Sequence, residues 1–185
     1  MTANLPVFPL HAVLFPGGEL PLRIFELRYR RLVDECGKNN PFVVVRIRDG
    51  QEVGEAAFTF DTGVRVRFTD LVSQRDGSLG ALLVAEERVQ LSAFRIEEDG
   101  LMFARVAALP ADGYVPVPED LRALALALDS QGHAVPDAGT LTWRLAERLP
   151  VSLDERQALL EEPDVARRLA RVRQWLLRYP GWLVA

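Results

Sequence analysis

Short alternating runs of apolar and polar residues fill the first 110 positions of the chain. In residues 63–69, Val64, Val66 and Phe68 alternate with polar side chains, which is the two-residue period of a half-buried strand. Similar apolar runs occupy residues 5–9, 42–47, 79–85, 89–96 and 101–107. The alternation changes phase at Phe94, which predicts a bulge or bend. Turn-forming pairs such as Asp76-Gly77 separate the runs, so we expect a barrel or sandwich of short strands.

One helix is expected to interrupt these strands near the N-terminus. The sequence Pro16-Gly17-Gly18 breaks the chain direction, and Pro21 suits the first turn of a helix. The apolar residues that then recur on one helical face are Phe25, Tyr29, Leu32, Val33 and Cys36. We therefore expect a helix over about 22–36. Ile24 and Leu27 lie off this face, so we expect two sides of the helix to be buried.

The pattern changes after the Pro- and Gly-rich segment 110–118. Beyond it the apolar residues recur with a period of 3.6, which is typical of helices. Ser152 with Glu155 matches a capping box, and Asp164 is a further candidate for a helix N-cap. We expect a β-rich domain over 1–112 and, over 118–185, a helical bundle packed on it.

The order of these segments resembles a known family. Residues 5–36, LPVFPLHAVLFPGGELPLRIFELRYRRLVDEC, resemble the opening of the Lon protease N-terminal domain family, in particular its stand-alone bacterial members. Residues 62–91 are similar to the central hairpin and the strand after it, and residues 149–176 to the helices that follow the barrel. The resemblance implies a mainly β fold, a PUA-like pseudobarrel followed by a small helical bundle. It also implies recognition of protein substrates, which in complete Lon are passed to an ATP-driven machine.

Composition and charge narrow the class of protein. Of the 185 residues, 49% are hydrophobic and 26% charged, as in a globular domain with a core. The net charge of -4 offers no general attraction for nucleic acid, although a local basic face could exist. Neither a signal peptide nor an apolar run of about 20 residues is visible, so we expect a soluble, cytoplasmic protein without membrane contact.

The residues that catalysis or metal binding would need are scarce. With two histidines, His11 and His133, and the lone Cys36, no zinc cluster of Cys and His can be assembled. Lys38 is the only lysine, and Asn39 follows it where a P-loop has Ser or Thr. No serine context matches the Ser-Lys dyad that the resemblance to Lon would imply. We expect no enzyme activity, no metal and no cofactor.

Charged runs and tryptophans allow a plain interpretation and a functional one. Acidic runs at 86–87, 97–99 and 161–162 are interpreted as solvated surfaces. The final helix carries Arg167, Arg168, Arg171, Arg173 and Arg178, interpreted as a solvated face paired with Glu161 and Glu162, or as a docking face for an acidic partner or RNA. Trp143, Trp175 and Trp182 all lie in the helical region, and Trp175 and Trp182, off or beyond the apolar stripe, are candidates for packing or for partner contact.

The candidate binding surface is therefore apolar and lies near the N-terminus. It comprises Phe15, Pro16, Ile24, Phe25, Glu26, Arg28 and Tyr29. We expect it to bind unfolded or partner protein segments, with an ATP-dependent protease as a further partner. Strand addition at a barrel edge would extend the contact.

Two alternatives stay open. PUA-like barrels elsewhere bind RNA, and the acidic balance argues against that here. In the second alternative, the barrel binds a small molecule in a pocket where His11, Glu26, Arg28 and Tyr29 converge.

Overall fold

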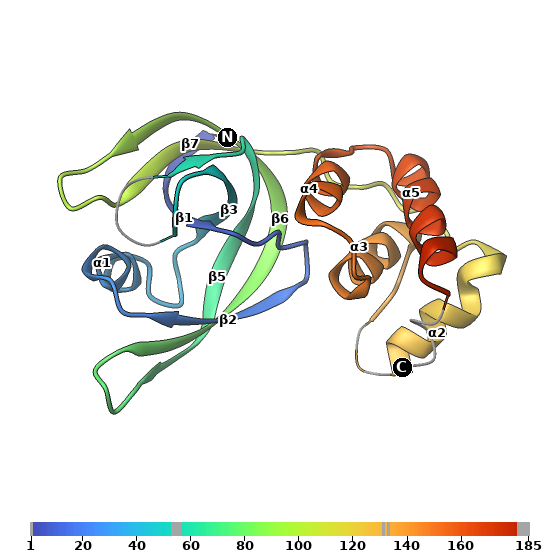
Figure 1. The fold of residues 1–185 in the computed structure, drawn as a ribbon, viewed down its shortest axis with the longest axis horizontal. Coiled ribbons are helices and arrows are strands. Elements are labelled where there is room, and N and C mark those ends of the chain that lie inside the picture. Colours follow the sequence, from blue (N-terminus) through green and yellow to red (C-terminus); the bar gives the residue numbers. More distant parts are fainter. Residues whose placement is uncertain (1, 53–56, 131, 133, 181–185) are drawn as a thin grey trace. The chain divides into compact units, whose positions relative to one another are not determined.

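A computed structural model describes residues 2–52, 57–130, 132 and 134–180 of the chain (Figure 1). The chain divides into two compact units, Met1–Leu109 and Pro110–Ala185. The first unit contains all the strands of the described residues and one helix, and the second contains the remaining helices.

The first unit is a closed barrel of five strands (Figure 1). These strands are β1 (Thr2–Leu10), β3 (Phe42–Asp49), β5 (Thr62–Ser73), β6 (Leu79–Ile96) and β7 (Met102–Ala108). They follow the order β1-β7-β6-β5-β3, and a parallel pairing of β1 with β3 closes the ring. Its buried core cluster consists of Val7, Val43, Val45, Val89, Leu91, Met102, Ala104 and Val106. The predicted barrel is therefore confirmed.

Strand β6 is longer than the sequence pattern indicated. Two strands were expected, over 79–85 and 89–96, but a single strand runs from Leu79 to Ile96. The charged residues between them stay in the sheet because Glu86 and Glu87 form ion pairs with Arg65 on the neighbouring β5. The predicted bulge is confirmed, since the register with β7 shifts between Ser92 and Arg95 and Ala93 has φ of 49°.

The prediction of a helix over 22–36 is wrong in its first turn. Residues Glu19–Ile24 form strand β2, paired antiparallel with the first half of β6, and helix α1 spans Leu27–Cys36. Leu20, Leu22 and Ile24 are less exposed than the residues between them, which is a period of two. The Ala85 amide donates to the Gly18 carbonyl at the start of the antiparallel ladder between β2 and β6. Hydrogen-bonded and non-hydrogen-bonded pairs alternate along such a ladder, so Pro21 belongs to a non-hydrogen-bonded pair. Its ring nitrogen therefore faces away from β6, a position where proline is tolerated.

The short strand β4 (Phe58–Thr59), which pairs with β3, was not predicted.

The second unit consists of helices. They are the 3-10 helix η1 (Glu119–Leu121) and the helices α2 (Arg122–Ser130), α3 (Ala138–Arg148), α4 (Leu153–Glu161) and α5 (Val165–Arg178). A side chain caps the start of α3, α4 and α5. The Ser152–Glu155 capping box is present, and Asp164 accepts hydrogen bonds from the Ala166 and Arg167 amides at 2.7 and 3.1 Å. Both cap predictions are confirmed.

Arg168 departs most from its predicted role, because its side chain is fully buried and not part of a solvated face. Its guanidinium lies 4.1 Å from the centre of the Trp143 ring and donates to the Glu162 carbonyl at 2.9 Å. It also forms an ion pair with Asp112. Because Asp112 belongs to the segment before the helices, this pair holds that segment against α3 and α5. At Gly139 a Cβ would lie 2.9 Å from the Asp112 carboxylate, so glycine makes room for the pair.

The other arginines and the tryptophans of the second unit are also placed. Arg173 pairs with Asp120 at 2.9 Å and Arg178 with Glu155 at 2.6 Å, in place of the expected Glu161 and Glu162. Trp143 and Trp175 are each 4% exposed, so both pack inside the unit. The candidate Trp182 lies outside the described residues.

We expect Arg168→Met to destabilise the second unit by about 3 kcal/mol, because it removes one partner of a buried ion pair and a cation–π contact. All three tryptophans of the chain follow residue 109, so tryptophan fluorescence during urea unfolding reports on this unit. Gly139→Ala should also lower the urea concentration at the unfolding midpoint, because the added methyl group would crowd the Asp112 carboxylate. The matched variant Arg173→Met, which breaks an exposed pair, should change stability by less than about 1 kcal/mol. Equal effects of the two arginine variants would contradict the assigned role of Arg168.

Candidate functional site

The turn from β2 into α1 places two large apolar side chains in solvent. Phe25 and Leu27 are 56% and 82% exposed, and they flank Glu26, the residue before the helix. The Glu26 carbonyl accepts hydrogen bonds from the amides of Tyr29 and Arg30 at 3.1 and 3.0 Å. The backbone of this turn is therefore fixed while its apolar side chains remain open. We refer to residues 25–27 as the β2–α1 corner.

Arg28 holds the corner in place from inside the barrel unit. Its side chain is 7% exposed, and it donates to the Glu26 carboxylate and to the Glu52 carbonyl, each at 3.1 Å. It also reaches the Gly100 carbonyl at 3.4 Å. A buried cation must be paired and hydrogen-bonded to be tolerated, and these partners come from three separate parts of the chain. Arg28 is therefore a residue that positions the corner.

Tyr29 packs beneath Arg28. Its ring stacks on Phe8 with the centroids 4.0 Å apart, and the Arg28 guanidinium lies 4.6 Å from the Tyr29 ring centre. Burial raises the pKa of the Tyr29 hydroxyl to about 12, and the neighbouring Arg28 charge opposes this shift only in part. Tyr29 thus stays neutral across the physiological range.

Of the four residues expected to line a small-molecule pocket, Arg28 and Tyr29 line a small cavity, but His11 is exposed and neither His11 nor Glu26 lines that cavity. The His11 amide donates to the Glu52 carboxylate, near the carbonyl that Arg28 contacts. The cavity beside Arg28 and Tyr29 measures about 10 Å³, enough for about one water molecule. This size counts against the small-molecule alternative at this place. The other histidine, His133, lies outside the described residues.

Outside the corner, the acidic residues considered for chemistry are largely engaged in ion pairs. Arg31 binds Glu97 and Asp99, and Arg65 binds Glu86 and Glu87. Within the described residues, no group of three or more His, Cys, Asp or Glu side chains is placed to hold a metal ion. Of the helices that the structure describes, none has the length and apolar character needed to span a bilayer.

The structure separates the seven candidate surface residues into two groups. Phe15, Ile24, Arg28 and Tyr29 are at most 7% exposed, so these four side chains are buried and do not form part of the accessible surface. Pro16 and Glu26 are half-buried, and Phe25 is exposed. Leu27, which the sequence analysis placed off the apolar stripe and expected to be buried, is the most exposed residue of the corner. Its position off the stripe was the one signal that could have identified it.

Comparison with known proteins identifies the family of the chain. The model of the substrate-binding domain of ATP-dependent protease La (Lon) matches residues 4–178. The chain belongs to this family. Lon protease 2 of Syntrophobacter fumaroxidans (strain DSM 10017 / MPOB) is 29% identical over 193 aligned positions, which cover 95% of this chain and 24% of that protein. The chain thus spans about a quarter of the length of this curated relative.

Solved structures of Lon N-terminal domains share the fold. The crystal structure of a Lon N-terminal domain protein from Xanthomonas campestris matches with a TM-score of 0.80 and 34% identity, over 94% of this chain and 98% of that one. The N-terminal domain of Lon protease from the Mycobacterium avium complex matches with a TM-score of 0.68 over 94% and 97% of the two chains. At 16% identity, the second match shows the fold alone. The predicted resemblance to the Lon N-terminal domain family is therefore confirmed.

We expect Tyr29→Phe to change how stability depends on pH above 10. Because the pKa of Tyr29 is about 12 when folded and about 10 when unfolded, the unfolded chain loses this proton first, and stability falls as the pH rises from 10 to 12. The decline attributable to Tyr29 approaches about 1.4 kcal/mol per pH unit. Urea unfolding of the barrel unit, followed by circular dichroism, should show a shallower decline for the variant. Identical slopes would mean that Tyr29 titrates normally.

Proposed function

We propose that the chain is a non-catalytic recognition module that binds unfolded or partner protein segments at the β2–α1 corner. The observation that carries this proposal is the exposure of Phe25 and Leu27 on a turn of a substrate-binding family fold. Exposed aromatic and leucine side chains beside one another are costly to leave in water, and covering them stabilises a complex.

The rigidity of the corner favours binding. Arg28 and the two hydrogen bonds to the Glu26 carbonyl hold the turn in one conformation before any partner arrives. A preorganised surface loses little conformational entropy on association, so more of the apolar contact energy appears as affinity.

Strand β2 offers a second mode of contact next to the corner. Among the described strands it pairs only with β6, so its outer edge carries backbone groups of Glu19 and Arg23 that a client strand could meet. Pro21 has no N–H to give to such a strand. We therefore assign the larger part of the affinity to the apolar side chains of the corner and a smaller part to strand addition.

The proposal separates recognition from processing. The chain corresponds to about a quarter of Lon protease 2, and we propose that an ATP-dependent protease is the partner that receives its clients. RNA binding would be the competing activity. Several arginines that could contact phosphate are already paired with carboxylates, Arg65 and Arg67 with Glu86 among them.

We expect the double variant Phe25→Ser, Leu27→Ser to weaken binding of an unfolded protein at least tenfold, because about 2–4 kcal/mol of apolar burial is lost. The probe is a fluorescently labelled protein kept unfolded by reduction and carboxymethylation, and the readout is its fluorescence anisotropy. Circular dichroism should show that the variant is folded, since both side chains are exposed.

The matched control is Tyr114→Ser with Leu177→Ser, which removes an aromatic residue and a leucine that are 76% and 82% exposed in the second unit. This control should bind within twofold of the wild type. Equal loss in both double variants would show that the corner is not the site. Strong retention of single-stranded RNA that falls steeply with salt, with no binding of the unfolded protein, would replace the proposal with the RNA alternative.

A further inference from the structure

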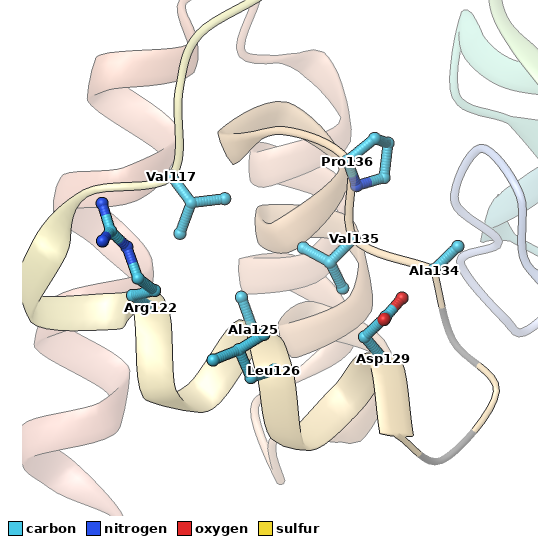
Figure 2. A pocket seen from close by; sticks show the side chains of 8 residues that line it. All are labelled: Val117, Arg122, Ala125, Leu126, Asp129, Ala134, Val135 and Pro136. Atoms are coloured by element: carbon cyan, nitrogen blue, oxygen red, sulfur yellow. The ribbon is translucent and has the colours of Figure 1, made fainter.

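The second unit carries an apolar groove of its own (Figure 2). A hollow of about 350 Å³ lies between helix α2 and residues 134–136. Its apolar lining includes Val117, Ala125, Leu126, Val135 and Pro136. The Leu126 side chain is 63% exposed, so the apolar lining of the groove reaches solvent.

Two opposite charges mark the ends of this groove. Figure 2 shows Arg122 at one end and Asp129 at the other, with Ala125 and Leu126 between them. Both charged residues belong to α2 and are seven positions apart. At a rise of 1.5 Å per residue, this spacing corresponds to about 10.5 Å along the helix axis.

Asp129 does not serve the helix that carries it. A helix favours basic residues in its last turn, but Asp129 lies in the last turn of α2. Arg122 has an exposed pair with Glu119 at 2.7 Å, and such a surface pair contributes little and can exchange partners. Charges that break a local rule without benefit to the fold are expected at functional positions.

The size and the charge pattern together define an occupant. A volume of about 350 Å³ is near the lower end of ligand pockets, which suits a few apolar side chains and not a folded domain. On a helix, residues at i, i+3, i+4 and i+7 share one face, and the first and last are also about 10.5 Å apart. A helix laid parallel to α2, with an acidic residue first and a basic residue last, would place opposite charges together at both ends.

We propose that this groove binds a short amphipathic helix of a client protein, with an acidic residue, two leucine-like residues and a basic residue at i, i+3, i+4 and i+7. This inference rests on the proposed function, since it assigns a second contact site to the same protein-binding activity. Unfolded chains form transient helices, so a groove for a single helical face is compatible with unfolded clients.

A labelled helical peptide tests the groove in the full 185-residue chain. The peptide has glutamate, two leucines and lysine at the stated positions in an otherwise alanine- and glutamine-rich sequence, and binding is followed by fluorescence anisotropy. Leu126→Asp should weaken binding at least tenfold. The matched control Leu177→Asp makes the same change at an 82% exposed leucine of the same unit and should bind within twofold of the wild type.

Charge complementarity has its own test. A second peptide, with glutamine in place of the glutamate and the lysine, should bind the wild type three- to tenfold more weakly than the first. Arg122→Gln and Asp129→Asn should each reduce this difference. A third peptide with a central proline cannot form the helix and should not compete.

The outcomes separate this inference from the proposed function. If the peptide fails to bind, or binds Leu126→Asp as well as the wild type, the groove assignment is overturned, whatever the unfolded protein does. Equally tight binding of the proline peptide would overturn the helical occupant. If the peptide binds in the expected way while the unfolded protein is not bound at all, the groove stands and the broader function falls.

Discussion

The buried guanidinium of Arg28 is the interaction on which the candidate site depends. It joins the corner residue Glu26 to the Glu52 carbonyl and to Gly100 in the turn between β6 and β7, so one side chain connects segments 24 and 72 residues away in sequence. A cation removed from water has to keep all of these partners, which leaves the β2–α1 turn few alternative conformations. The open position of Phe25 and Leu27 is a consequence of this constraint.

The second unit uses a similar solution at a different place. Arg168 is buried against Trp143, as Arg28 is against Tyr29, and it draws a distant carboxylate, Asp112, into the same contact. In both cases an aromatic face and carbonyl or carboxylate oxygens surround an arginine that local sequence would place in solvent. Each unit thus contains a buried cation that ties irregular segments to regular elements.

Local patterns predicted the elements well because local physics decides them. The alternation in β5, the bulge near Phe94 and the Ser152 and Asp164 caps depend on residues within a few positions of one another. The apolar pattern of residues 22–26 fits both the two-residue period of a strand and the 3.6-residue period of a helix. Pairing with β6, more than 50 positions away, makes the residues up to Ile24 a strand. The burial of Arg168 depends on Asp112, 56 residues earlier, which no periodicity encodes. The exposure of Leu27 and Leu126 likewise results from what the rest of each unit leaves uncovered.

Pro21 has a consequence for how copies of this protein behave toward one another. An open strand edge is a template on which identical chains can stack into aggregates, and β2 lies at such an edge close to two exposed apolar side chains. The missing N–H of Pro21 and the flanking charges of Glu19 and Arg23 interrupt the ladder that self-association would need. A protein that exposes apolar groups beside an open strand edge is in this way kept from polymerising through that strand.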